Sequence, residues 1–146
     1  MKKFLKRLKK DERGLTLVEL LAVIVILGIV GVIAFVAIGN VIDNSKKDAH
    51  IANAQQVISA VELLEASGDT LNGSEDASEI DSVGKLTDPW DTNNNGYDFT
   101  VERSDSRNAI VISSVHSECS FTNATKSNLI KDGRDACGKT YTVSDD

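Results

Sequence analysis

The chain has 146 residues, of which 41% are hydrophobic, only seven are aromatic, and the formal net charge is -6. This length leaves room for one small soluble domain once an apolar segment is set aside. The acidic balance argues against binding of nucleic-acid phosphates, and the absence of a Ser/His/Asp spacing, a phosphate loop or a zinc pattern argues against an enzyme.

Charge is distributed unevenly along the chain. Residues 1–14 hold seven Lys/Arg against two acids, a net charge of +5, whereas the remainder carries -11. Because positively charged flanks of a membrane helix stay on the cytoplasmic side, we expect the basic leader inside and the acidic part outside.

An uninterrupted apolar run follows the leader. It covers residues 20–39, which is long enough for a helix to cross ~30 Å of hydrocarbon. Glu19 stands at its start, where a carboxylate is costly unless a partner meets it. A secretory signal would be cut after its apolar region, at small residues, but here Gly14 precedes that region, so a cut after it would remove the basic leader and keep the apolar helix.

The residues Gly14-Leu15-Thr16-Leu17-Val18-Glu19 resemble the processing site of type IV prepilins and pseudopilins. The resemblance implies cleavage by a prepilin peptidase between Gly14 and Leu15, followed by N-methylation of Leu15. It also implies that Glu19 pairs with the new terminal amine during assembly, and Thr16 matches the family's usual second residue. Two departures are visible: Leu15 replaces the preferred Phe, and Val36 stands where a helix-breaking proline is common.

A helical period continues beyond the apolar run. Apolar residues recur at three- and four-residue steps, which predicts one helix over residues 15–66 that is apolar on all sides at first and amphipathic later. The recurring positions are Ile51, Ala54, Val57, Ile58, Val61 and Leu64. Ser67-Gly68-Asp69 is a suitable stop.

The remainder predicts a small sheet. Residues 67–86 are polar and loop-like, residues 97–101 and 109–115 alternate as strands around a turn at 103–108, and residues 140–143 add a third strand. The predicted fold class is α+β: a long N-terminal helix packed on a small antiparallel β-sheet, as in pilins. The expected divisions are a removable leader (1–14), a transmembrane or filament-core helix (15–39), its amphipathic continuation (40–66) and a β-domain (67–146).

Cys119 and Cys137 are the only cysteines, and both lie in the part expected outside the cell. A disulfide between them is the simplest reading, worth ~3 kcal/mol by the loop-closure estimate. The resemblance implies that the loop 119–137 forms a surface region.

A calcium-loop pattern begins at Asp91 and ends at Glu102. Its oxygen-bearing positions would be Asp91, Asn93, Asn95, Tyr97 and Glu102, with Gly96 at the sharp turn. An Asn-Gly hairpin turn explains the same residues without a metal. We therefore expect no cofactor, except Ca²⁺ if residues 91–102 form a calcium loop. The preceding Asp88-Pro89-Trp90 also resembles a short motif of major pseudopilins.

The resulting functional expectation is a structural subunit of a type IV pilus-like filament. Its partners would be further copies of itself, the prepilin peptidase and a membrane assembly platform, with no direct nucleic acid. It would wait as a single-pass plasma-membrane protein and end in a cell-surface filament.

Two alternatives stay open. One is a pseudopilin of a type II secretion or competence DNA-uptake system, and a competence role would need a basic patch drawn from Arg103, Arg107, Lys126, Lys131, Arg134 and Lys139. The other is a membrane-anchored calcium- or ligand-binding module that does not polymerise, which would tolerate Glu19→Ala.

Overall fold

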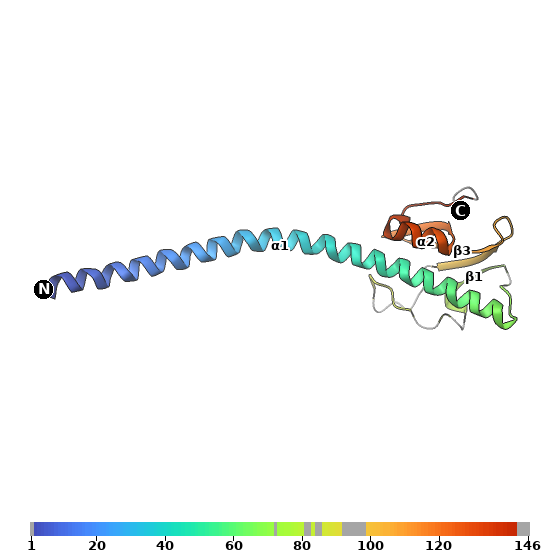
Figure 1. Ribbon diagram of the computed structural model, residues 1–146, viewed down its shortest axis with the longest axis horizontal. Helices are drawn as coiled ribbons and strands as arrows, with labels where there is room; N and C mark the ends of the chain where they lie inside the picture. Colours follow the sequence, from blue (N-terminus) through green and yellow to red (C-terminus); the bar gives the residue numbers. More distant parts are fainter. Residues whose placement is uncertain (1, 72, 81–82, 84–85, 92–98, 143–146) are drawn as a thin grey trace. The chain divides into compact units, whose positions relative to one another are not determined.

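A computed structural model describes residues 2–71, 73–80, 83, 86–91 and 99–142, with side chains described from Thr16 onward, except for Glu79. The chain divides into two compact units, Met1–Ile42 and Asp43–Asp146, which we call unit 1 and unit 2. The helix α1 (Lys2–Ser67) contributes to both (Figure 1). The fold class is therefore the predicted one, a long N-terminal helix with a small antiparallel sheet.

Helix α1 begins earlier than predicted. The expectation placed its start at Leu15, but the helix already includes the leader from Lys2 onward. Lys, Arg, Leu and Glu dominate the leader, and all four are good helix formers. The helix ends at Ser67 as predicted, because Gly68 takes a φ of +103° and its N–H donates to the carbonyl of Glu65.

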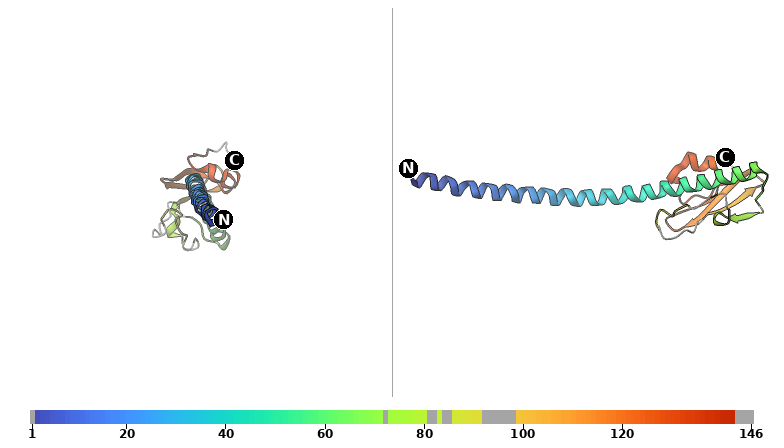
Figure 2. Two further views of the ribbon diagram at one scale, coloured as in Figure 1. Left: turned by 90° about the vertical axis from the view of Figure 1, so that its left-hand side faces the viewer. Right: turned by 90° about the horizontal axis from the view of Figure 1, so that it is seen from below.

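Unit 2 contains a four-stranded antiparallel sheet in the order β1 (Ser74–Asp76), β2 (Phe99–Ser104), β3 (Ala109–His116) and β4 (Cys119–Ala124). A short 3-10 turn, η1 (Ala77–Glu79), follows β1, while α2 (Lys126–Asp132) and η3 (Gly133–Ala136) follow β4. Figure 2 shows the strands beside the C-terminal part of α1.

The core of unit 2 lies between α1 and the sheet. Helix α1 buries the side chains that recur at helical spacing, and β2 and β4 bury alternate residues against them. From β3, Ile110 and Ile112 join this core. The largest fully buried side chains are Phe121, Ile58, Ile112, Leu129, Val57, Val61, Val101 and Val111. Full burial of one such aliphatic chain stabilises the fold by about 1.5–3 kcal/mol.

Two predictions about the sheet need correction. The loop-like residues 67–86 include β1, and the strand expected at 140–143 is, over its described residues 140–142, only a parallel bridge between Thr140 and Thr122. The disulfide loop 119–137 contains β4 and α2, which the sequence did not predict. Short segments escape periodicity because three to six residues rarely define a pattern. Helix α2 carries a local signal nonetheless, since Thr125 caps it and exchanges hydrogen bonds with Asn128.

The disulfide between Cys119 and Cys137 forms as predicted, with the two Cα atoms 4.6 Å apart. It joins the first residue of β4 to the residue that follows η3. The segment after it runs beside β4, where Gly138 donates to the carbonyl of Ser120 and Tyr141 to that of Thr122. The disulfide therefore ties the C-terminal segment to the sheet edge.

Replacement of both cysteines by alanine should lower the free energy of unfolding of unit 2 by about 2–5 kcal/mol, because the unfolded chain loses a crosslink over an 18-residue separation. Thermal unfolding of the full chain in detergent measures this. A reducing agent should lower the midpoint of the wild-type protein and leave that of the variant unchanged. Equal midpoints for both proteins would contradict a stabilising disulfide.

Candidate processing and assembly segment

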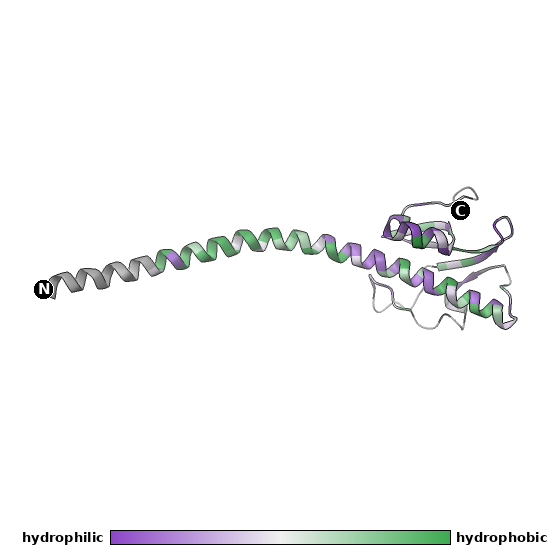
Figure 3. Ribbon diagram, viewed as in Figure 1, coloured by the Kyte–Doolittle hydropathy of each residue, from purple (hydrophilic) through white to green (hydrophobic). Residues whose placement is uncertain are grey.

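Residues 16–42 of α1 present apolar side chains around the whole helix. Leu17 is 70% exposed, Val32 69% and Phe35 82%, and the most hydropathic 18-residue window of the described helix has mean hydropathy 3.2 with none of its residues buried in the structure. Figure 3 shows this stretch of α1 as mostly green, with a purple patch near its N-terminal end. Soluble monomers rarely leave so large an apolar surface in water, so lipid or other protein must cover it.

Glu19 lies inside this surface, between Val18 at 67% exposure and Leu20 at 64%. It is the only charged residue from Thr16 to Ile42. In hydrocarbon its carboxylate needs a cation or a proton, because an unpaired buried charge costs several kcal/mol. Its place near the N-terminal end of the expected mature helix also favours a negative charge.

Gly14 and Leu15 lie within α1, one turn before Glu19. Residues four apart face the same side of a helix, so cleavage between Gly14 and Leu15 would create an amine on the side that carries Glu19. Thr16 is exposed at the start of the segment. The processing and assembly roles of these residues stay predictions.

Polar residues mark the other end of the segment. Asp43, Lys46, Lys47 and Asp48 follow Ile42. From Thr16 onward, the first side chains that α1 buries are those of His50 and Ile51, immediately after this polar group. The same helix thus passes from an apolar surface on all sides to a helix with one buried face.

The calcium prediction falls mostly outside the described residues, because 92–98 are among the residues that the structure leaves undescribed. Of its flanking positions, Asp91 is exposed, and Glu102 lies in β2, paired with Val111 of β3. Among the side chains that are described, no three His, Cys, Asp or Glu residues gather in a way that would hold a metal. Calcium binding stays an untested prediction.

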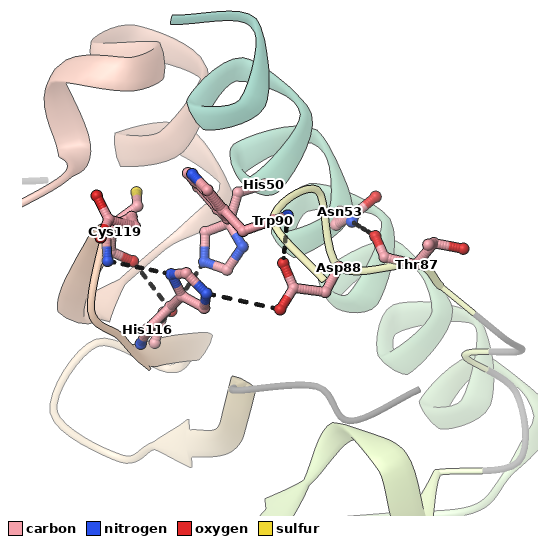
Figure 4. A network of polar contacts seen from close by, with 9 residues as sticks. His50, Asn53, Thr87, Asp88, Trp90, His116 and Cys119 are labelled. Carbon is pink, nitrogen blue, oxygen red and sulfur yellow. Dashed lines mark hydrogen bonds and ion pairs between the residues drawn. The ribbon is translucent and has the colours of Figure 1, made fainter. Parts of the chain in front are cut away.

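The sequence did not predict a group of buried and half-buried polar side chains in unit 2, around His50 and His116. His50 of α1 is only 4% exposed and its Nε2 lies 2.9 Å from the Oγ of Ser114 on β3 (Figure 4). Its ring lies 4.6 Å from that of Phe99 and 5.4 Å from that of Trp90, measured between centroids. Burial and the charge of His116 lower the pKa of His50 from its usual 6.5 to about 4, against a smaller opposing effect of Asp88.

The second histidine of the chain completes this group. His116 Nε2 lies 3.5 Å from the Oδ2 of Asp88, and the ring of His116 stacks on that of Trp90 at 4.4 Å. Asp88 in turn accepts a hydrogen bond from the backbone N–H of Trp90 at 2.8 Å. A lone histidine carries no periodic signal, and His50 meets Ser114 across 64 residues of sequence, so only the fold brings these residues together.

The lowered pKa of His50 predicts acid-sensitive stability. The folded chain takes up this proton less readily than the unfolded chain, so the stabilisation is complete above pH 6.5 and is lost as pH falls toward 4. The free energy of unfolding should drop by up to ~3 kcal/mol over that range. Thermal unfolding of the full chain at pH 7 and pH 4.5 measures it. His50→Gln should flatten the dependence and Ala52→Gln, at an exposed position of α1, should not; equal slopes in all three proteins would refute the assignment.

Comparison with known proteins supports one assignment. Residues 9–35 match the family model of the prokaryotic N-terminal methylation motif, the leader signal of type IV pilin-like proteins. The match covers residues 9–14 of the leader, the Gly14–Leu15 bond, Glu19 and most of the apolar segment. No curated protein and no solved structure matches the chain.

Proposed function

We propose that this chain is the precursor of a structural subunit of a type IV pilus-like filament. The observation that carries the proposal is the methylation motif at residues 9–35, set on a helix whose apolar side chains stay exposed up to the start of unit 2. A prepilin peptidase cuts between Gly14 and Leu15 and methylates Leu15, and the remaining helix anchors the subunit until it joins other copies.

The location of the cut supports this sequence of events. Removal of residues 1–14 takes away a net charge of +5 that would hold the N-terminus at the cytoplasmic face. The apolar helix stays attached to the acidic unit 2, unlike the helix of a cleaved secretory signal. The product is a membrane-anchored subunit whose helix begins at the bilayer surface.

The charge balance at the new N-terminus favours assembly. In the bilayer the Leu15 amine and the Glu19 carboxylate both lose hydration. The amine is stabilised by the Glu19 carboxylate of its own chain or of a neighbouring copy. Helix association in lipid gains little from the hydrophobic effect, so packing and polar contacts must drive it. Glu19 is the one residue of the segment 16–42 that offers a charged contact.

Unit 2 supports a structural role over DNA binding. Four of the six basic residues that a DNA-binding patch would need lie within salt-bridge distance of acids: Arg103 with Glu65, Lys126 with Glu62, Arg134 with Asp48 and Lys139 with Asp132. Cations held by acids offer little net charge to phosphates. A pseudopilin of a secretion system uses the same segment and remains the second candidate, favoured by Asp88-Pro89-Trp90.

Mass spectrometry of the N-terminal peptide tests processing. In protein sheared from intact cells, the expected peptide starts at Leu15 and carries one added methyl group. Gly14→Leu should leave the leader attached and keep the protein in the membrane fraction, since the peptidase needs the small residue at the cut. An intact leader on wild-type protein, found only in membranes, would contradict the proposal and leave an anchored module.

Substitution Glu19→Ala tests assembly separately from insertion. Removing the only charge of the segment makes membrane insertion easier, so the variant should reach the membrane in normal amounts. It leaves the Leu15 amine without its partner, which should weaken the free energy of subunit association by about 3–5 kcal/mol. Each 1.4 kcal/mol lowers the association constant about tenfold. Sheared filaments should fall below detection.

The matched control is Glu62→Ala, which removes an exposed acid of unit 2 and only a surface ion pair with Lys126. Its filament yield should equal that of the wild type. Normal filaments from Glu19→Ala would rule out the assigned role of Glu19 and favour the module that does not polymerise.

A further inference from the structure

The leader has two different sides when its residues are placed on the helix that they form. Helix α1 starts at Lys2 and therefore includes the leader, and successive residues of a helix are rotated by about 100°. On this spacing the apolar positions Phe4, Leu5 and Leu8 fall on one side. All seven basic positions of the leader fall on the opposite side: Lys2, Lys3, Lys6, Arg7, Lys9, Lys10 and Arg13.

This segregation distinguishes the leader from the segment that follows it. Residues 16–42 of α1 present apolar side chains around the whole helix, as a helix that crosses a bilayer does. A leader that served only to hold the N-terminus in the cytoplasm would need its net charge of +5, but not the confinement of its basic residues to one side. A helix with one basic and one apolar side is the kind that lies in the plane of a membrane surface.

The cytoplasmic leaflet is the surface within reach of this helix. Leu8 precedes Leu15 by seven residues, which is about 10 Å along a helix. Residues 2–10 hold six Lys/Arg and no acid, and anionic lipid headgroups attract such a cluster over a Debye length of ~8 Å. A nucleic acid would offer the same charge but no hydrocarbon for the apolar side, so an anionic lipid surface fits both sides of the leader.

We propose that the leader of the uncut chain lies along the cytoplasmic surface of the bilayer, with Phe4, Leu5 and Leu8 toward the acyl chains and the basic positions at the level of anionic lipid phosphates. The partner of the leader is therefore the membrane itself. From the proposed function this inference takes only the insertion of the apolar helix, and it holds whether or not the chain is later cut or assembled.

Asp11 and Glu12 limit the length of the lipid contact. They follow Leu8 by three and four residues, so they fall on the side of the apolar positions. A carboxylate at the boundary with the acyl chains is costly, and anionic headgroups repel it. The contact of the leader with lipid therefore ends about one turn after Leu8.

The junction near Gly14 must change direction when the leader lies along the surface. In the structure α1 continues from the leader into the apolar segment without interruption. A helix along the membrane surface and a helix across the bilayer have different axes, so a bend is needed between Leu8 and Leu15. Gly14 has the lowest helix propensity of the residues between them. A bend there breaks hydrogen bonds of α1 and leaves the Gly14–Leu15 bond, the predicted cut site, in unwound backbone at the bilayer surface.

The test uses the full, uncut chain, one copy in each lipid nanodisc, so that neither the peptidase nor another copy takes part. Because Cys119 and Cys137 form a disulfide, an introduced cysteine is the only free thiol for a nitroxide label. Leu8→Cys places the label on the apolar side and Lys10→Cys on the basic side. In nanodiscs that contain phosphatidylglycerol, the label at position 8 should collide mainly with oxygen dissolved in lipid, and the label at position 10 mainly with an aqueous nickel chelate.

Nanodiscs of phosphatidylcholine alone are the control for lipid charge. The difference between the two labels should fall severalfold there, because zwitterionic headgroups do not hold the basic side at the surface. Equal accessibility of both labels in the phosphatidylglycerol nanodiscs, or an undiminished difference in phosphatidylcholine, would overturn the proposal.

Amide hydrogen exchange of the unlabelled chain tests the bend. Relative to phosphatidylcholine, the phosphatidylglycerol nanodiscs should slow the exchange of the amides of residues 4–10 and speed that of Leu15, where the helix unwinds. Unchanged exchange of residues 4–10 would overturn the surface-bound leader. Slower exchange of Leu15 together with residues 4–10 would overturn the bend and indicate a leader that stays in line with the membrane helix.

A matched variant separates the sidedness of the leader from its charge. Leu5→Lys/Lys6→Leu/Leu8→Lys/Lys9→Leu keeps the composition and net charge of the leader but mixes apolar and basic positions around the helix. It should insert with its leader in the cytoplasm like the wild type, and phosphatidylglycerol should no longer protect its leader amides. Equal protection of the wild type and this variant would show that charge alone binds the leader, and would overturn the amphipathic contact.

Discussion

The structure depends on one constraint: α1 must satisfy two different surroundings along a single helix. Over residues 16–42 apolar side chains cover every side, and the helix needs an apolar solvent or other helices. After Asp43 only one face is apolar, and it is buried by the four-stranded sheet. Backbone hydrogen bonds of a helix are satisfied internally in either setting, which is why one element serves both.

This division explains how much the sequence could predict. Apolar residues at i, i+3, i+4 and i+7 from Ile51 to Val61 identify the buried face, since burial against a flat sheet selects that period. The strand predicted at 109–115 corresponds to β3, whose run of β-branched residues Ile110, Val111 and Ile112 is buried without interruption. The resemblance at Gly14 to Glu19, which the methylation motif bears out, rests on a local pattern that needs no fold.

What the sequence could not predict depends on long-range contacts. The sequence did not predict β4, because its first residue, Cys119, also fits the start of a disulfide loop. Nor does the sequence indicate that Arg107 donates hydrogen bonds to the carbonyls of Asn123 and Tyr141. His50 lies four residues before Ala54, on the buried face of α1, but histidine is a polar residue and does not count in an apolar pattern. Its burial is tolerable because its Nε2 forms a hydrogen bond with the hydroxyl of Ser114, 64 residues away in sequence, and because Ser114 donates a hydrogen bond to the carbonyl of Cys119.

The placement of polar groups follows from the same constraint. Glu19 and His50 are both ionisable groups placed where charge is costly, and in each case a partner decides whether the charge is present. For Glu19 the proposed partner is an amine created by cleavage, so charge neutralisation would be coupled to processing and assembly. For His50 the partners are already folded, so the ring stays neutral until acid adds a proton. A helix that tolerates one such residue in lipid and one in a protein core links the state of the chain to its surroundings at both sites.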